Sequence, residues 1–363
     1  MDAGWRIGSG HVMRCLTIAS ALREAGIDCT FLCRAHDGHM GAAIERAGFP
    51  VRLEPVDPEY ARRDDYAGWR GASLDSDIRA TVTAVAETGA EMLIVDHYGL
   101  DAELERALRA HVRGIVVLDD LYDKPHDCDV LIDQNIGHRP EYFDGLVPSA
   151  AVRLVGADFA PLRQEFAERR EAALARRANV EEPRTLLVAV GGSDSLDVTS
   201  RVLDALDPAS KLGLEWVDTA HIVLAGMAPH LPSVRARARS LPMVRLHVDS
   251  REMPDLMVQS DLAIGGSGVT AIERCVLGLP TLIVIMAENQ EGSARRLERL
   301  GASRTLGHGA TLTAEAIAAE LVALHVDRSA FRAMIEAASV LCDGLGLERI
   351  IPPIVSLLSN SRS

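Results

Sequence analysis

A histidine follows a glycine turn at the start of a helical pattern near the N-terminus. The turn is Gly8-Ser9-Gly10, and His11 falls in the first turn of the expected helix. Glycines let the backbone approach a ligand closely, and the free amides of a helix N-terminus attract an anion. The positive end of the helix disfavours a charged imidazole, so we expect His11 to be neutral and able to accept a proton from water. The alternative is a histidine that only hydrogen-bonds a loop carbonyl.

Short polar side chains follow three successive strand patterns in the first half of the chain. Ligands of open α/β sheets collect at the carboxyl ends of strands, so this clustering favours a ligand site. An aspartate or tyrosine there can orient a histidine or a water, although Asp96 is equally suited to cap the next helix. The side chains are Asp96 and Tyr98 after the first strand, Asp119 and Asp120 after the second, and Asn135 after the third.

Two glycine turns in the second half each join an apolar strand to the start of a helix. Such turns cradle phosphate with backbone amides. The first contains Gly191, Gly192 and Ser193, and the second contains Gly266, Ser267 and Gly268.

Three polar residues accompany the second turn. Glu273 lies within the helix that follows it, where a carboxylate can reach back to accept both hydroxyls of a ribose. Asn289 and Gln290 follow the last predicted strand and can bind sugar hydroxyls, or else cap a helix. A surface position is the alternative for Glu273.

The elements that must position these residues belong to the α/β class. Short runs rich in valine, isoleucine and leucine alternate with helical patterns, which is typical of parallel sheets. Because 363 residues exceed the roughly 250 to 300 at which single cores stop growing, we expect two Rossmann-like doubly wound domains facing each other across a cleft. The expected division is an N-terminal domain at 1–165, a linking helix at 166–183, a C-terminal domain at 184–350 and a tail at 351–363. Strands are predicted at 27–33, 51–53, 92–95, 114–118, 130–132, 152–154, 185–190, 221–224, 244–248, 262–264 and 281–284.

The charge and the residue composition of the chain argue against several classes of function. The formal net charge of −14 argues against nucleic acid as a partner, and no apolar run is long enough to span a bilayer. The chain carries no secretory signal pattern, so we expect a cytoplasmic protein whose six scattered cysteines are free thiols and hold no metal. We interpret the arginine run of the linking helix as its solvated face. The run comprises Arg169, Arg170, Arg176 and Arg177.

Taken in order, these segments resemble the UDP-2,4-diacetamido-2,4,6-trideoxy-β-L-altropyranose hydrolases of pseudaminic acid biosynthesis. GSGHVMRC at 8–15 and VDHYGLD at 95–101 are fairly specific to that family and its near relatives. GGSGVTAIE at 265–273 occurs widely among two-domain glycosyltransferases. The resemblance covers nearly the whole chain through further segments at 118–120, 129–135, 142–148, 159–166, 190–194, 288–290 and 343–349.

The resemblance implies a GT-B-like fold whose C-terminal domain binds UDP. It also implies hydrolysis of the bond between the sugar and UDP, with inversion and without a metal or other cofactor. His11 then corresponds to the catalytic base and Tyr98 to its partner, while Glu273 takes the ribose. The remaining implied contacts to substrate are Gly8, Gly10, Arg14, Asp96, Asn135, Gly191, Gly192, Ser193, Gly266, Ser267, Gly268, Asn289 and Gln290.

Two alternatives stay open. A GT-B transferase or a non-hydrolysing epimerase would handle the same donor, and an inactive nucleotide-sugar binding protein would only retain it. We expect a UDP-sugar as the small-molecule partner, and a monomer or weak homo-oligomer.

The chain departs from the family at its first residues. Family members begin with a strand before the glycine turn, whereas this chain opens at Met1-Asp2-Ala3-Gly4. We expect that the start codon was placed late or that the sheet is one strand short. Loss of the strand would remove a parallel partner from its neighbour and an anchor from the His11 loop.

Overall fold

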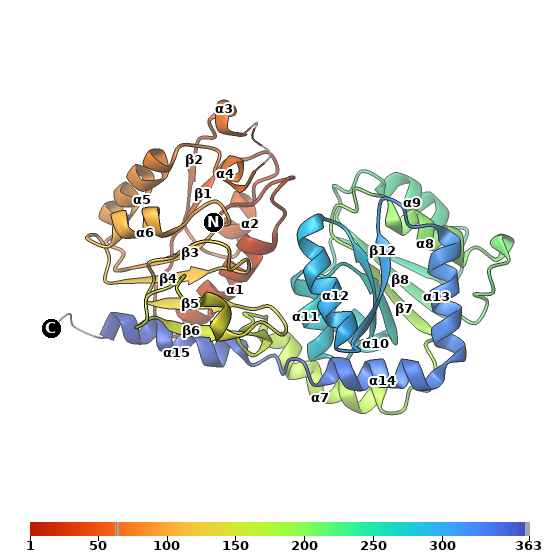
Figure 1. The fold of residues 1–363 in the computed structure, drawn as a ribbon. Coiled ribbons are helices and arrows are strands. Elements are labelled where there is room, and N and C mark those ends of the chain that lie inside the picture. Colours follow the sequence, from red (N-terminus) through yellow and green to blue (C-terminus); the bar gives the residue numbers. More distant parts are fainter. Residues whose placement is uncertain (62, 64, 360–363) are drawn as a thin grey trace. The chain divides into compact units, whose positions relative to one another are not determined.

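The chain divides into two compact units, seen in the computed structural model, which describes residues 1–61, 63 and 65–359 (Figure 1). Unit 1 comprises Met1–Leu162 and Leu345–Ser363, and unit 2 comprises Arg163–Gly344. Each unit contains parallel strands alternating with helices and has its own hydrophobic core. The predicted α/β class with two Rossmann-like domains is confirmed.

Unit 2 is built on one six-stranded parallel sheet with the order β12-β11-β10-β7-β8-β9. Counted from β7, this is the strand order 3-2-1-4-5-6 of a doubly wound nucleotide-binding fold. The order reverses between β7 and β10, so the loops after these two strands diverge at the point where such sheets bind ligands. The strands are β7 (Thr185–Ala189), β8 (Thr219–Leu224), β9 (Val244–Val248), β10 (Leu262–Gly265), β11 (Thr281–Ile285) and β12 (Ser303–His308).

Helices cover the sheet of unit 2. Because its central strands are enclosed on both faces, they are apolar. Every residue of β10 and β11 is buried, as expected for central parallel strands enclosed on both faces. The helices are α7 (Gln164–Arg177), α8 (Val198–Leu206), α9 (Leu231–Ala238), α10 (Met253–Gln259), α11 (Val269–Val276), α12 (Glu291–Arg299), α13 (Ala314–Val326) and α14 (Arg328–Ser339), with short turns η3 (Pro208–Ser210) and η4 (Glu288–Gln290).

Unit 1 contains two separate parallel sheets. One pairs β1 with β2, and the other has the order β3-β4-β5-β6. The sheets consist of β1 (Phe31–Arg34), β2 (Val51–Glu54), β3 (Met92–Asp96), β4 (Gly114–Leu118), β5 (Val130–Asp133) and β6 (Val152–Val155). The helices are α1 (Gly10–Glu24), α2 (Gly41–Arg46), α3 (Pro58–Ala61), α4 (Tyr66–Trp69), α5 (Leu74–Thr88), α6 (Ala102–Leu108) and α15 (Gly346–Ser359), with η1 (Pro140–Phe143) and η2 (Ala157–Phe159).

The four-stranded sheet of unit 1 is covered on both faces. In β4, Ile115 and Val117 join the cluster with α6, whereas Val116 and Leu118 join the cluster that contains Ile18 of α1. Successive side chains of a strand point to opposite faces, so this run of apolar residues serves two cores. Ile18 of α1 therefore packs against one face of this sheet.

The C-terminal helix α15 returns to unit 1. Ile350 and Ile354 are fully buried in the same cluster as Ile18, beneath β4 and β5 (Figure 1). The observed division thus differs from the expected one, in which 345–350 belonged to the second domain and 351–363 formed a tail. Apolar residues at helical spacing in this segment explain the difference, because they bury against unit 1.

The linking helix is part of unit 2, and its arginines are not a solvated face. Arg177 is only 2% exposed and donates to the carbonyls of Met257 and Ser260 at 2.5 and 3.0 Å. Arg169 pairs with Asp255 at 2.6 Å. The interpretation from the charge run was wrong, because guanidinium groups here satisfy buried carbonyls at the end of α10.

Every strand that the sequence predicts is present, and its ends lie within four residues of the predicted ones. The predicted strand at 27–33 begins only at Phe31, and β12 was not predicted. In β12, Arg304, Thr305 and Gly307 interrupt the apolar pattern, so the edge strand lacks the usual signal. Within the described part of the chain, no helix combines the length and apolar character needed to cross a bilayer.

Candidate active site

The loop before α1 is held in a tight turn. Gly4 and Gly8 form an antiparallel bridge, with N–H to carbonyl distances of 3.3 and 2.8 Å. Gly8 has φ +82°, a left-handed conformation in which a side chain would be strained. The helix begins at Gly10, and His11 in its first turn is buried with 6% exposure.

Asp96, at the end of β3, binds the imidazole of His11. Nδ1 of His11 lies 2.6 Å from one carboxylate oxygen of Asp96, which is completely buried. A carboxylate only accepts hydrogen bonds, so the proton is assigned to Nδ1 and the lone pair to Nε2. Asp96 therefore orients His11 rather than capping the next helix.

Arg14 keeps Asp96 ionised. Its Nε and Nη2 lie 2.6 and 2.5 Å from the two carboxylate oxygens. Burial by itself raises the pKa of Asp96, but the charge of Arg14 and the contact with His11 hold that pKa well below its usual range. Because these contacts stabilise its negative charge, the carboxylate of Asp96 does not take the proton from His11.

Tyr98 and Asp120 extend this network. The hydroxyl of Tyr98 donates to Asp120 at 3.0 Å, and Arg14 forms an ion pair with the same carboxylate. Burial and Asp120 raise the pKa of Tyr98 well above its usual value, so the phenol stays protonated. Its ring meets His11 edge to face, with centroids 4.5 Å apart.

Asn135 joins the network from β5. Its amide nitrogen donates to the carbonyl of Asp120 at 3.1 Å. The carboxylate that precedes it, Asp133, binds Nδ1 of His138 at 2.5 Å. Three neighbouring strand ends thus converge, as predicted, and bring His11, Arg14, Asp96, Tyr98 and Asn135 together.

The first glycine turn of unit 2 follows β7 and is closed by Asp194. Gly191 adopts φ +140°, and the carboxylate of Asp194 accepts from the amides of Val198 and Thr199 at 2.9 and 2.8 Å. The N-terminus of α8 is therefore capped by the protein itself. Gly192 and Ser193 are exposed, but the amides of Val198 and Thr199 are not available to a phosphate.

The second glycine turn follows β10 and has an uncapped helix behind it. Gly268 precedes α11 and supplies no side-chain cap. Ser267 donates its hydroxyl to the carbonyl of Gln290 at 2.8 Å, and the side chain of Gln290 accepts from Met286 at 3.3 Å. Amides at this N-terminus are available to an anion, so this turn suits a phosphate better than the turn after β7.

The buried side chain of Arg274 stabilises the second glycine turn. It is 1% exposed and donates to the carbonyl of Gly266. Burial lowers the pKa of Arg274 to about 10, which leaves it charged at neutral pH. A Cβ on Gly265 would lie 2.3 Å from this guanidinium, so the turn requires glycine there.

Glu273 lies partly exposed on α11. No hydrogen bond partner faces its carboxylate among the described residues. Burial raises its pKa to about 7, with Arg163 and Arg274 opposing the effect. An unpartnered carboxyl near a free helix N-terminus is suited to bind hydroxyl groups. Asn289 is exposed, whereas Gln290 is occupied by the contacts of the turn.

Several site residues were not predicted as such. Asp120 was noted only as a strand-end residue, and Arg274 and Asp194 were not singled out. Asp194 lies four residues before α8, outside the usual N-cap position, and nothing in the sequence marks Arg274 as lying under a glycine turn. Across the described residues, no three side chains are arranged to hold a metal ion.

These two α/β units, one with the 3-2-1-4-5-6 order, define a GT-B-like fold. Solved structures share it: MurG of Acinetobacter baumannii has a TM-score of 0.66 at 15% identity, covering 96% of both chains. The calicheamicin glycosyltransferase CalG4 has a TM-score of 0.65 at 16% identity, covering 98% of this chain and 97% of that one.

Sequence comparison agrees with the resemblance found in the motifs. The chain is 24% identical over 301 residues to the UDP-2,4-diacetamido-2,4,6-trideoxy-beta-L-altropyranose hydrolase of Campylobacter jejuni, covering 83% of this chain and 95% of that protein. It is 22% identical over 358 residues to the spore coat polysaccharide biosynthesis protein SpsG of Bacillus subtilis, covering 96% and 94%. No protein-family model matches the chain. The resemblance to the hydrolase family is confirmed.

Proposed function

We propose that this protein hydrolyses a UDP-linked 2,4-diacetamido-2,4,6-trideoxy hexose to free sugar and UDP, with inversion at the anomeric carbon, for the biosynthesis of a nonulosonic acid such as pseudaminic acid. The observation that carries the proposal is the contact of 2.6 Å between Asp96 and Nδ1 of His11, which leaves Nε2 as a base. Similarity to a hydrolase of that name supports the substrate class.

In the proposed reaction His11 acts as general base. Nε2 takes a proton from a water, whose oxygen forms a bond to the anomeric carbon as the bond to the UDP oxygen breaks. The leaving electrons stay on UDP, and attack from the opposite face inverts the configuration. Asp96 stabilises the imidazolium that forms, and Arg14 keeps Asp96 from accepting the proton itself.

In unit 2, we assign UDP to the turn after β10. The pyrophosphate lies against the amides of Ser267 and Gly268, where the dipole of α11 stabilises the charge that develops on leaving. Glu273 accepts the ribose hydroxyls. Gly191, Gly192, Ser193, Asn289 and Gln290 are assigned to the remaining phosphate and sugar contacts.

The proposal is tested by following turnover in a proton NMR time course with the UDP-linked diacetamido sugar and EDTA. The expected result is release of UDP and the inverted free sugar. His11→Asn should lower kcat about 10²- to 10⁴-fold and leave the affinity for UDP nearly unchanged. The matched control is His111→Asn, since His111 is an exposed histidine of the same unit. Full turnover by His11→Asn would remove the assignment of the base.

A GT-B transferase is the second candidate, favoured by the similarity to the glycosyltransferase CalG4. In that case UDP would be released only when a hydroxyl acceptor is present, and the sugar would be joined to that acceptor. Tight UDP binding with no product under either condition would instead indicate a nucleotide-sugar binding protein.

A further inference from the structure

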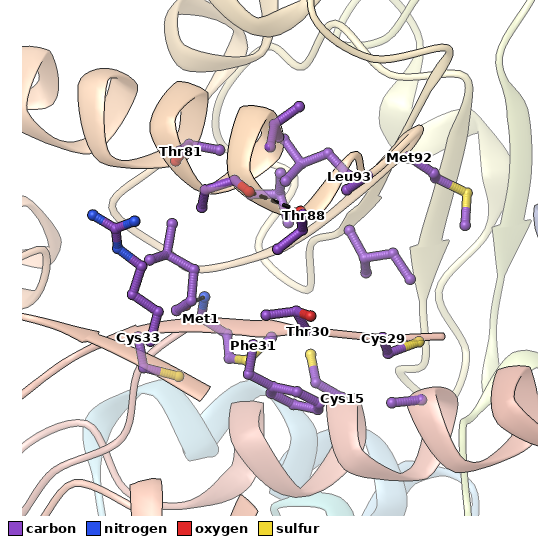
Figure 2. Close-up of a pocket in the computed structure, with 18 of the residues that line it drawn as sticks. Met1, Cys15, Cys29, Thr30, Phe31, Cys33, Thr81, Thr88, Met92 and Leu93 are labelled. Carbon is purple, nitrogen blue, oxygen red and sulfur yellow. Dashed lines mark hydrogen bonds between the residues drawn. The ribbon is translucent and has the colours of Figure 1, made fainter. Parts of the chain in front are cut away.

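A cavity of about 720 Å³ in unit 1 is not the place where a sugar meets the base. It lies between β1 and β3, and Figure 2 shows Phe31, Met92 and Leu93 among the residues that line it. Neither His11 nor Tyr98 belongs to its lining. Ligands of parallel sheets lie at the carboxyl ends of the strands, so the surface that meets the sugar is at the ends of β3, β4 and β5.

At the end of β5, a buried carboxylate holds a second histidine. Nδ1 of His138 lies 2.5 Å from a carboxylate oxygen of Asp133, which is completely buried. Burial raises the pKa of Asp133 to about 6, against the effect of its contact with His138. The group is therefore mostly ionised at neutral pH and accepts from Nδ1, so the lone pair of the imidazole is assigned to Nε2. His11 and Asp96 form the same arrangement.

Two tyrosines enclose the ring of His138. Its centroid lies 5.1 Å from that of Tyr122 and 5.4 Å from that of Tyr142, and the two tyrosine centroids are 5.2 Å apart. We call these three rings the aromatic triad. Only 8% of the His138 side chain is exposed, and its Nε2 has no hydrogen-bond partner among the described residues. Because a nearly buried nitrogen without a partner is costly, Nε2 is suited to a ligand that donates a hydrogen bond.

Tyr122 is held in a backbone conformation that side chains rarely adopt. Its φ is +44°, and its amide donates to the carboxylate of Asp119 at 3.0 Å. The residue is 41% exposed, so its ring faces solvent instead of filling a core. Strained residues concentrate at ligand-binding sites, where the surrounding structure holds them in place. The ring of Tyr122 is therefore an apolar surface fixed beside Nε2 of His138.

The aromatic triad and the groups around His11 share two loops. Asp120 lies two residues before Tyr122, and Asn135 lies three residues before His138. Asn135 donates to the carbonyl of Asp120 at 3.1 Å, and the amide of His138 donates to the carbonyl of Asn135 at 3.2 Å. A ligand that contacts His11 thus has the triad along the same edge of the sheet.

The distance between the strand ends indicates which part of the sugar meets the triad. Asp96, which binds His11, ends β3, and Asp133 ends β5, with β4 between them. Two strand spacings of about 4.8 Å place these ends roughly 10 Å apart. His11 acts at the anomeric carbon, whose neighbour C2 carries one acetamido group, whereas C4 lies across the ring. The acetamido group at C4 is therefore the one that can contact a site at β5.

An acetamido group has the two features that the triad matches. Its N–H is a donor for the lone pair of Nε2 of His138, and its methyl group is apolar, as is the face of the Tyr122 ring. Sugar sites commonly combine an apolar wall with a few placed polar groups, and the triad has both.

We propose that the aromatic triad binds the acetamido group at C4 of the sugar, with its N–H donating to Nε2 of His138 and its methyl group packed on Tyr122. This inference rests on the proposed function for the identity of the substrate. It makes Tyr122 and His138 determinants of sugar specificity, and no bond forms or breaks at the triad.

The test compares two substrates in each variant. One is the UDP-linked 2,4-diacetamido-2,4,6-trideoxy hexose, and the other is its analogue with hydrogen in place of the acetamido group at C4. Tyr122→Ala removes the exposed ring, and His138→Phe keeps an aromatic ring but removes Nε2. The matched control is Tyr60→Ala, since Tyr60 is a tyrosine of the same unit on α3. His138→Phe leaves the buried Asp133 without its partner, so Tyr122→Ala is the variant that tests the triad with the fold intact.

The quantity measured is the ratio of kcat/KM for the diacetamido sugar to kcat/KM for the analogue. Tyr122→Ala and His138→Phe should each lower this ratio about tenfold or more, mainly through a higher KM for the diacetamido sugar. Tyr60→Ala should leave the ratio unchanged. The Kd for UDP alone should stay the same in every variant, because UDP lacks the sugar.

Two outcomes overturn the proposal. An unchanged ratio in Tyr122→Ala would mean that the triad does not contact the acetamido group. Equal losses of kcat/KM with both substrates would mean that the triad affects only the structure of the site.

Failure of the proposed hydrolysis would give a different result, because the original protein would then turn over neither substrate. In that case the Kd values of the two UDP-sugars, from calorimetric titration, decide the role of the triad. A preference for the diacetamido sugar that Tyr122→Ala removes would support the proposal, and equal Kd values for both sugars in the original protein would overturn it.

Discussion

The chemistry of His11 depends on groups that come from distant parts of the chain. Asp96 binds its Nδ1 at the end of β3, and Arg14, one turn further along α1, binds both oxygens of Asp96. Arg14 also pairs with Asp120, which follows β4. The imidazole therefore has a fixed orientation and tautomer before any substrate binds, which reduces the reorganisation needed during proton transfer.

Asp96→Asn tests this positioning. The amide of asparagine can donate to Nδ1, which would shift the proton of His11 to Nε2 and remove the base. We expect kcat to fall about 10²- to 10³-fold with KM nearly unchanged. Asp120→Asn, which removes a different carboxylate from Arg14, should have a smaller effect on kcat.

The pH profile distinguishes positioning from a general loss of structure. Positioning predicts that Asp96→Asn changes the pH dependence of kcat, whereas Asp120→Asn keeps the shape of the original profile. Equal losses in both variants, with parallel drops in Tm, would contradict the role of Asp96.

The raised pKa of Glu273 predicts that UDP binding depends on pH. Its pKa is raised to about 7 by burial, so the carboxyl loses its proton between about pH 6 and 8. Only the ionised form accepts from both ribose hydroxyls, and affinity for UDP should therefore rise severalfold over this range. Calorimetric titration at pH 6, 7 and 8 measures this affinity. Glu273→Gln is the control, because it keeps the titration of UDP itself; a rise of the same size in this variant would contradict the assignment.

The same pKa shift predicts how stability without ligand depends on pH. The folded state holds the proton up to about pH 7, whereas the ordinary carboxyl pKa of 4.5 applies to the unfolded chain. The stabilisation from the proton is complete below about pH 4.5 and is lost as pH rises through 7. Glu273→Gln should remove this loss and raise stability at pH 8 by about 1 to 2 kcal/mol, since part of the carboxyl keeps its hydration.

The turn after β10 shows how one element combines packing with ligand access. A Cβ on Gly265 would lie 2.9 Å from the carbonyl of Ala189 as well as against Arg274, whereas a Cβ on Gly268 meets nothing within 4 Å. The first glycine is required by the fold, and the second leaves open space before α11.

Gly265→Ala should therefore lower the stability of the protein, whereas Gly268→Ala should lower its affinity for UDP. Gly265→Ala should destabilise the protein by about 1 to 3 kcal/mol, because backbone must shift. Gly268→Ala should keep the Tm within about 1 °C but weaken UDP binding about tenfold or more, because its methyl group occupies the approach of the pyrophosphate. Thermal melts and calorimetric titration measure both. Unchanged UDP affinity in Gly268→Ala would place the pyrophosphate elsewhere.

Elements were more predictable from the sequence than their contacts. Central strands such as β4 and β11 are unbroken apolar runs, so their positions followed from composition. The edge strand β12 carries polar residues and a glycine, and it is a strand because it pairs with β11. The convergence of His11 with Asp96 was predictable as a neighbourhood of strand ends, but the ion pairs of Arg14 depend on the packing of α1 against the sheet, which no local pattern encodes.

Two of the hydrophobic clusters in the described part of the chain each lie within one unit. The cluster with Leu321 of α13 lies entirely in unit 2, and the cluster with Ile354 lies entirely in unit 1. The chain passes between the units at Arg163 and again at Leu345. Because each unit buries its own apolar surface, each should unfold as a cooperative body.

A pair of core substitutions tests this independence. Leu321 and Ile354 are both fully buried, and truncating either to alanine should cost its own unit about 2 to 5 kcal/mol. Differential scanning calorimetry should then show two transitions, of which Ile354→Ala lowers one and Leu321→Ala the other. UDP, which we assign to unit 2, should raise only the transition that Leu321→Ala lowers. A single transition shifted equally by both variants would mean that the units unfold together, and a shift by UDP of the Ile354 transition would move the nucleotide site out of unit 2.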